Sequence, residues 1–303
     1  MTEQAVQIFW APAGSTMPSL GSRALLDTTD GDTPNLRMPV RMLSVDTPEV
    51  TARTEERARE IDHNFQQLAT WIREGQAPID ARLAEFMLPK LDTGKAGTLQ
   101  FEQGQAASVF AKQNMENRLL RPDGTKRNLF IRTADAPFDD NSRLLAYLAP
   151  TFSRAELAQL TRQQRSTFNL DLVTAGHAAP FVIYPSIPSA PDLALLIRMA
   201  TEARAGLRGI WSQPATLLAY EYRAMEKLFH ITRKKVSGQL EDPDRLFSWR
   251  ERYCADMTTR VLHDPDDYFG IQPEHRLWIW PDDLNEAVAR LNLSPAPRLA
   301  AAE

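Results

Sequence analysis

Short runs of β-forming residues recur in the first half of the chain and alternate with helical segments, and this alternation constrains the fold most strongly. Such runs cover residues 23–28, 40–45 and 128–133, and "AVQIFW" near the start is another. Turn-rich pieces such as "TTDGDTPN" separate them. Short strands interleaved with helices predict an α+β domain built on a small sheet or barrel.

Helical periodicity dominates the rest of the chain. Between residues 51 and 91, apolar side chains recur at three- and four-residue spacings, and Pro78 divides this pattern into two helices. A strand is predicted over "RLWIW", residues 276–280, and further helices are predicted over 105–120, 190–206, 214–235, 242–262 and 282–291. We therefore expect a first domain over residues 1–212 and a mainly helical C-terminal extension over residues 213–303.

Composition excludes several classes of protein. The 303 residues are 43% hydrophobic, which supports a sizeable core, and the formal net charge is -4. Any attraction to nucleic acid must therefore be local. Cys254 is the single cysteine, so no internal disulfide forms, and no Cys/His cluster has zinc-ligand spacing. No signal-peptide pattern or membrane-span window occurs, so we expect a soluble, cytoplasmic protein without a membrane partner.

Acidic residues and arginines occur in an order that suits phosphodiester hydrolysis. This reaction needs a metal ion or hydrogen-bond donors on the phosphate, a base that activates water, and cations that stabilise the transition state. The turn "DGDT", residues 30–33, offers Asp32, and with it Asp30, as hard oxygen ligands suited to Ca²⁺ or Mg²⁺. Taken alone, an acidic glycine turn is more often a solvated turn.

The segment "VRMLSVDTPE" supplies Arg41, Asp46, Thr47 and Glu49 within nine positions. Side chains alternate along a strand, so Arg41 and Asp46 would point to opposite faces. They share a site only if the strand ends or bends near Asp46, and Pro48 favours such an ending. Two of these residues also have a purely structural explanation. Arg41 would suit a surface ion pair, and Glu49 would suit the first turn of a helix.

Arg143 is the second candidate phosphate ligand. It stands at the start of the predicted strand "LLAYL". A guanidinium group there can donate two parallel hydrogen bonds to phosphate oxygens, which the point charge of a lysine cannot match.

Five of these pieces follow one another in a recognisable order. They are "DGDT", "VRMLSVDTPE", an arginine followed by "LLAYL", "NLDLVTAGHA", and a helix ending in "GIW". The ordered set resembles the staphylococcal nuclease (thermonuclease) family over residues 20–212, with interruptions. The resemblance implies a five-stranded OB-type β-barrel with packed helices, and a nuclease that hydrolyses DNA or RNA with Ca²⁺, or with Mg²⁺ or another divalent ion.

The resemblance also implies a role for each matching residue. Three of them would ligate the metal ion: Asp32 and Asp46 through their carboxylates, and Thr47 through its backbone carbonyl. Glu49 would be the general base for the attacking water. Arg41 and Arg143 would bind the phosphate and stabilise the pentacoordinate transition state.

The chain departs from the family pattern in several places. Helical insertions fall at about residues 51–100 and 150–166, beside the expected cleft. The sequence "DNS" before Arg143 replaces the family's Lys-Tyr-Gly, so one cation and one aromatic ring for the terminal phosphate are lost. Tyr184 keeps one of the family's two nucleotide-pocket tyrosines, and Val182 stands in the place of the other.

Two alternatives to an active nuclease remain open at this point. The first is a non-catalytic module that binds nucleic acid or protein. Against it, a pure binder has no need of an acidic residue such as Glu49 beside a phosphate. The second is a latent nuclease whose helical additions form a lid or an interface for a protein partner or an oligomer. The basic run at residues 233–235 is more typical of a solvated helix end than of a nucleic-acid contact.

Overall fold

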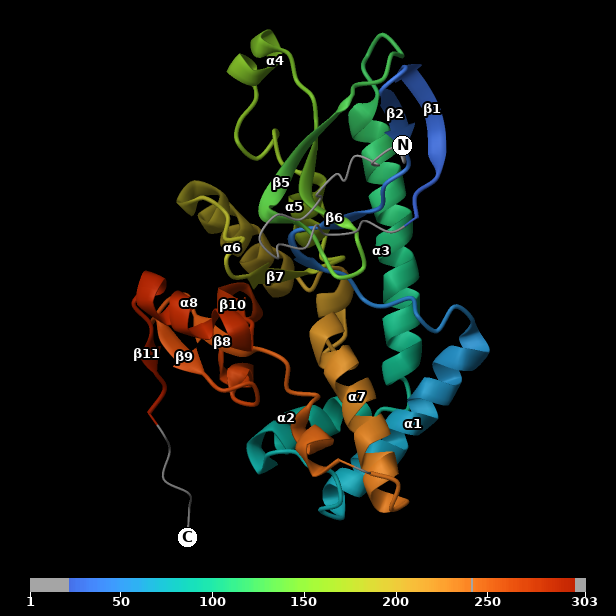
Figure 1. Ribbon diagram of the computed structural model, residues 1–303, viewed down its shortest axis with the longest axis vertical. Coiled ribbons are helices and arrows are strands. Elements are labelled where there is room, and N and C mark those ends of the chain that lie inside the picture. The colour runs from blue at the N-terminus through green and yellow to red at the C-terminus, as the bar shows by residue number, and fades with distance from the viewer. Residues whose placement is uncertain (1–21, 241, 298–303) are drawn as a thin grey trace, which may run out of the picture.

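The computed structural model describes residues 22–240 and 242–297, and it confirms the α+β class (Figure 1). The "AVQIFW" run lies outside the described residues. The helices are α1 Glu55–Arg73, α2 Ala81–Leu91, α3 Ala96–Leu119, α4 Arg154–Gln159, α5 Phe168–Thr174, α6 Ala190–Ala205, α7 Ala219–Val236 and α8 Leu284–Leu291. None of the helices in these two ranges is long and apolar enough to cross a membrane.

The strands of the described residues form three sheets. The first is a hairpin of two strands, β1 Leu25–Asp30 and β2 Thr33–Leu36. The second has the order β3 Val40–Met42, β6 Leu144–Pro150 and β5 Leu129–Phe138. The third has the order β11 Ser294–Pro295, β9 Val261–His263, β8 Tyr253–Asp256, β10 Arg276–Ile279, β7 Ala179–Ile183 and β4 Ser44–Asp46. The pairings of these strands do not close any of the three sheets into a barrel.

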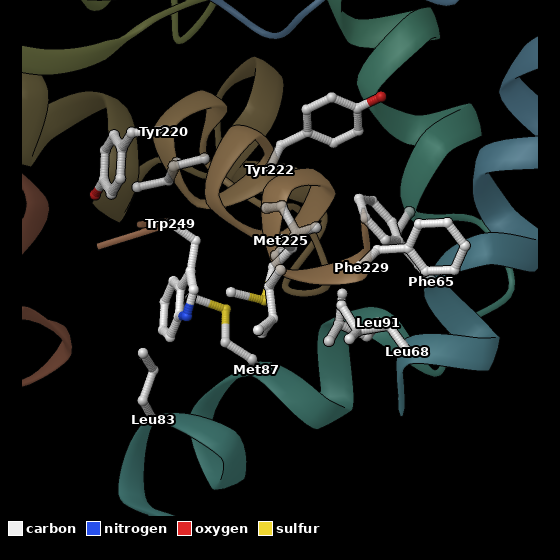
Figure 2. Packing of buried hydrophobic residues seen from close by; sticks show 14 of the residues in the cluster. Phe65, Leu68, Leu83, Met87, Leu91, Tyr220, Tyr222, Met225, Phe229 and Trp249 are labelled. Atoms are coloured by element: carbon white, nitrogen blue, oxygen red, sulfur yellow. The ribbon is translucent and has the colours of Figure 1, made fainter. Parts of the chain in front are cut away.

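The predicted helical hairpin is present, and side-chain caps set its boundaries. The hydroxyl group of Thr54 accepts a hydrogen bond from the backbone of α1, and the carboxylate of Asp80 does the same for α2. The apolar face of α1 packs against α2, α3 and α7. Figure 2 shows Phe65 of α1, Met87 of α2 and Met225 of α7 meeting in one core. The insertion is therefore built into the main hydrophobic core.

The C-terminal region shares the same sheet and core as the rest of the chain. β10 lies between β8 and β7, and Leu277 pairs with Val182 across the predicted boundary at residue 212. Helix α7 is anchored by Glu221, which is 1% exposed and lies 2.6 Å from the ammonium group of Lys90 in α2. Strands and helices on both sides of residue 212 thus stabilise each other.

The structure differs from the sequence prediction at residues 242–262. A helix was expected there, but the chain forms a short 3₁₀ turn over Pro243–Phe247 and then β8 and β9. Cys254, expected inside this helix, is fully buried in β8 opposite Trp278 of β10. Pairing with β10 decides the conformation, since a buried run this short fits a helix or a strand equally well.

Candidate functional site

A bend in the backbone creates the candidate site. The run predicted as one strand over residues 40–45 is two strands: β3 pairs with β6, and β4 pairs with β7. Ser44 lies at the junction with a φ of 59°, in the left-handed region that non-glycine residues seldom adopt. This bend removes the alternation that would hold Arg41 and Asp46 on opposite faces. Nη2 of Arg41 lies 2.8 Å from Oδ1 of Asp46.

The bend that the sequence required near Asp46 therefore lies at Ser44, two residues before Asp46 and ahead of Pro48. Ser44 is buried, and its hydroxyl group lies 2.6 Å from that of Tyr147 in β6. This contact holds the bend against the neighbouring sheet.

A second arginine, which the sequence did not assign to the site, joins these residues from α7. Nη2 of Arg223 lies 2.7 Å from Oδ2 of Asp46, and Nη1 lies 2.5 Å from Oε1 of Glu49. Nη1 also donates to Oδ1 of Asp46 at 3.3 Å. One guanidinium group thus bridges both carboxylates. We call Arg41, Asp46, Glu49 and Arg223 the charged cluster.

Burial differs among the members of the charged cluster. The side chain of Asp46 is 0% exposed, whereas those of Arg41 and Arg223 are 31% and 30% exposed, and that of Glu49 is 24% exposed. Burial opposes the charged form of Arg223, but Asp46 and Glu49 outweigh it and raise the pKa of this guanidinium. The buried carboxylate therefore organises groups that water and ligands can reach.

Helix α3 supports the charged cluster from behind. The buried side chain of Gln100 accepts a hydrogen bond from the backbone N–H of Glu49 at 2.8 Å and donates one to the carbonyl oxygen of Leu217 at 2.5 Å. Leu217 lies just before α7. Gln100 thus fixes the segment that carries Glu49 relative to the helix that carries Arg223.

Gly104 of α3 lets the Glu49 segment lie against the helix. A Cβ atom at this position would come within 2.8 Å of the carbonyl oxygen of Pro48 and of Cγ1 of Val50. No side chain fits there unless the segment that carries Glu49 shifts. The close approach therefore depends on the absence of a side chain at position 104.

We expect Gly104→Ala to lower both stability and activity. Overpacking costs about 1–3 kcal/mol, and the better helix propensity of alanine offsets about 1 kcal/mol of this. Urea unfolding and a cleavage assay would measure the two effects. Gly270→Ala is the matched control, since its added methyl group meets no atom within 4 Å. Equal behaviour of the two variants would show that the packing of α3 on the Glu49 segment is unimportant.

A third guanidinium group flanks the charged cluster. Arg252 precedes β8, and its guanidinium carbon lies 3.8 Å from the centre of the Trp280 ring and 5.5 Å from that of Phe181. The guanidinium carbon of Arg223 lies 5.9 Å from the same Phe181 ring. Burial, followed by the like charge of Arg223, lowers the pKa of Arg252 to about 10. Trp280 is 39% exposed and borders this positive region.

The other predicted site residues have different surroundings. Arg143 lies just before β6, beside β3, but its guanidinium group pairs with Asp139 at 2.7 Å. Tyr184 is 4% exposed and packs in the core between α6 and α8, so its ring has no open face for a base. Thr47 is half-buried and directly follows β4.

Asp32, the remaining predicted metal ligand, lies in the turn of the exposed β1–β2 hairpin and accepts a hydrogen bond from the hydroxyl group of Thr33 at 3.2 Å. Among residues 22–240 and 242–297, no group of three or more His, Cys, Asp or Glu side chains is placed to hold a metal ion. Both carboxylate oxygens of Asp46 already accept hydrogen bonds from guanidinium groups. In this arrangement the carboxylate oxygens do not form a ligand set for a divalent ion.

Sequence reasoning missed Arg223 and Arg252. Arg223 lies in the first half of α7, ahead of the basic run at residues 233–235, and faces Asp46. The sequence holds no local signal for this contact, since the two residues are 177 positions apart.

Comparison with known proteins identifies no family. No protein-family model matches the sequence, and a search of curated proteins finds no significant match. The resemblance to the staphylococcal nuclease family therefore depends on the ordered motifs alone.

Proposed function

We propose that this protein is a nuclease that hydrolyses phosphodiester bonds in DNA or RNA at the charged cluster. One observation carries the proposal. Arg41 lies before the backbone bend, and Asp46 and Glu49 lie after it. Contacts of Asp46 with Arg41 and of Arg223 with both carboxylates nevertheless join all four side chains in one partly exposed cluster. This combination of cations and an accessible carboxylate matches what attack of water on a phosphodiester requires.

Three side chains of the charged cluster have separate tasks. Arg41 uses the N–H groups that do not contact Asp46 to bind non-bridging phosphate oxygens, where charge builds up in the transition state. Asp46 orients the guanidinium groups. Glu49 takes a proton from water through Oε2, which accepts no hydrogen bond from the described residues, while Oε1 stays with Arg223. The water oxygen then bonds to phosphorus as the phosphorus–oxygen ester bond breaks, the departing oxygen takes a proton from solvent, and Glu49 returns its proton to solvent.

Three further expectations remain part of this proposal. They are the OB-type barrel that the resemblance implies, the cytoplasmic location expected from the sequence, and a partner surface on the helical C-terminal region. Arg143 also remains part of this proposal as a phosphate ligand, although its guanidinium group pairs with Asp139. The positive region around Arg252 and Trp280 offers a place for the neighbouring nucleotide, because every base has a face that can stack on an aromatic ring.

The second candidate function is non-catalytic binding of nucleic acid. The contact between Arg223 and Glu49 favours it, since this guanidinium group already occupies one of the two carboxylate oxygens of Glu49. Such a module would use Arg41, Arg223 and Arg252 for phosphate contacts alone.

A cleavage assay separates the two functions. Labelled single-stranded DNA, double-stranded DNA and RNA would be incubated with the full chain in Ca²⁺, in Mg²⁺ and in EDTA, and binding would be followed by fluorescence anisotropy. We expect cleavage of at least one substrate, and its loss in Arg41→Gln. Binding of all substrates without cleavage of any would contradict the nuclease and favour the binding module.

A further inference from the structure

We infer that Arg223 takes the place of a divalent cation in the charged cluster, so that the site works without a metal ion. The contact geometry and the expected effect of metal ions on stability do not depend on the proposed nuclease function. The catalytic consequence rests on the proposed nuclease function.

The first argument is occupancy. The guanidinium group of Arg223 lies between the two carboxylates, with nitrogen to oxygen distances of 2.7 Å to Asp46 and 2.5 Å to Glu49. Calcium in proteins needs six to eight oxygen ligands at about 2.3–2.6 Å. An ion could approach Asp46 only by displacing a guanidinium group from a carboxylate that is fully buried.

The second argument is charge. Arg41 contacts the same carboxylate, and Arg252 shares the Phe181 ring with Arg223. A divalent ion added beside these arginines would meet strong like-charge repulsion. Two further carboxylates lie near the cluster: Glu251 pairs with Lys227 and Arg252, and Glu226 accepts a hydrogen bond from Tyr222. Burial raises the pKa of Glu226.

The third argument is the rigidity of α7. Glu221, two residues before Arg223, is buried and accepts hydrogen bonds from Lys90 and from the backbone N–H of Leu218. Tyr222 is 1% exposed and meets the ring of Phe65 edge to face. The backbone at Arg223 is therefore held in place. Its side chain cannot leave without stripping Asp46 of one of its two cations.

The inference predicts how metal ions affect the folded protein. EDTA-treated full-length protein would be heated with and without millimolar Ca²⁺ or Mn²⁺. We expect an unchanged melting temperature for the wild type. Arg223→Gln leaves the two carboxylates with one cation fewer, so Ca²⁺ should raise its melting temperature. Arg233→Gln, an exposed arginine of the same helix, is the matched control and should show no response to Ca²⁺.

Arg223→Lys keeps the positive charge if the glutamine variant does not fold, and we expect it to show no response to Ca²⁺. Ca²⁺-dependent stabilisation of the wild type that Glu49→Gln abolishes would overturn the inference. A folded Arg223→Gln protein that ignores Ca²⁺ would also overturn it, because the two carboxylates would then be no cation site.

Cleavage provides an independent arm of the test. We expect the wild type to cleave its substrate at similar rates in EDTA and in Ca²⁺. Cleavage that stops in EDTA and returns with Ca²⁺ would overturn the inference and leave the nuclease standing. A lack of cleavage under every condition would remove the proposed function, and the melting experiment would still decide whether Arg223 replaces the ion.

Discussion

Glu49→Gln is expected to lower the rate of phosphodiester cleavage by about 10²- to 10⁴-fold, the range for loss of a positioned general base. The amide keeps an oxygen that can accept the hydrogen bond from Arg223, and the backbone N–H of Glu49 still donates to Gln100. The fold and the affinity for substrate should therefore change little. Steady-state kinetics would show the loss in kcat, and the melting temperature would verify the fold.

Glu226→Gln is the control for this prediction. Glu226 is the carboxylate next to Glu49, half-buried and hydrogen-bonded to the hydroxyl group of Tyr222 at 3.1 Å. Among the described residues, Glu226 makes no contact with Arg41 or Asp46, so the Glu226→Gln variant should keep most of the cleavage rate. If Glu226→Gln were inactive and Glu49→Gln active, Glu226 would be the base.

Asp46→Ala is expected to destabilise the protein strongly. Removing one partner of a buried ion pair costs about 3–5 kcal/mol, because the opposite charges lose their compensation. Both arginines that contact Asp46 are nearly one third exposed, so water screens part of this loss, and we expect about 3 kcal/mol. Urea unfolding followed by circular dichroism would measure the change in the free energy of unfolding.

Asp32→Ala provides the comparison, since the family resemblance implies the same metal-ligand role for both aspartates. Asp32 is exposed in a hairpin turn, so its replacement should change the free energy of unfolding by less than about 0.5 kcal/mol. A similar large loss in both variants would mean that the hairpin and the charged cluster are joined in solution.

Local patterns in the sequence predicted much of the fold. The spacing of Ile61, Phe65 and Leu68 indicated α1 because one face of a helix must enter the core, and Pro78 falls in the gap between α1 and α2. The helix predicted over residues 242–262 was wrong because the strand and helix conformations are closely matched for this segment. The partner that decides the outcome is β10, which is specified elsewhere in the chain.

The candidate site was predicted in part for the same reason. The need for a bend between Arg41 and Asp46 followed from the alternation of side chains along a strand. Its position at Ser44 arises because β3 pairs with β6 in one sheet and β4 pairs with β7 in another. The meeting of Arg223 with Asp46 brings together α7 and β4, which lie far apart in the chain, and no local pattern encodes it.

The order of these segments along the chain has a consequence for synthesis. Asp46 leaves the ribosome 177 residues before Arg223, and β7 is made well before β10, its neighbour in the sheet. Throughout that interval the nascent polypeptide lacks the guanidinium group that bridges its carboxylates. In each new chain the charged cluster can therefore form only after translation has passed Arg223.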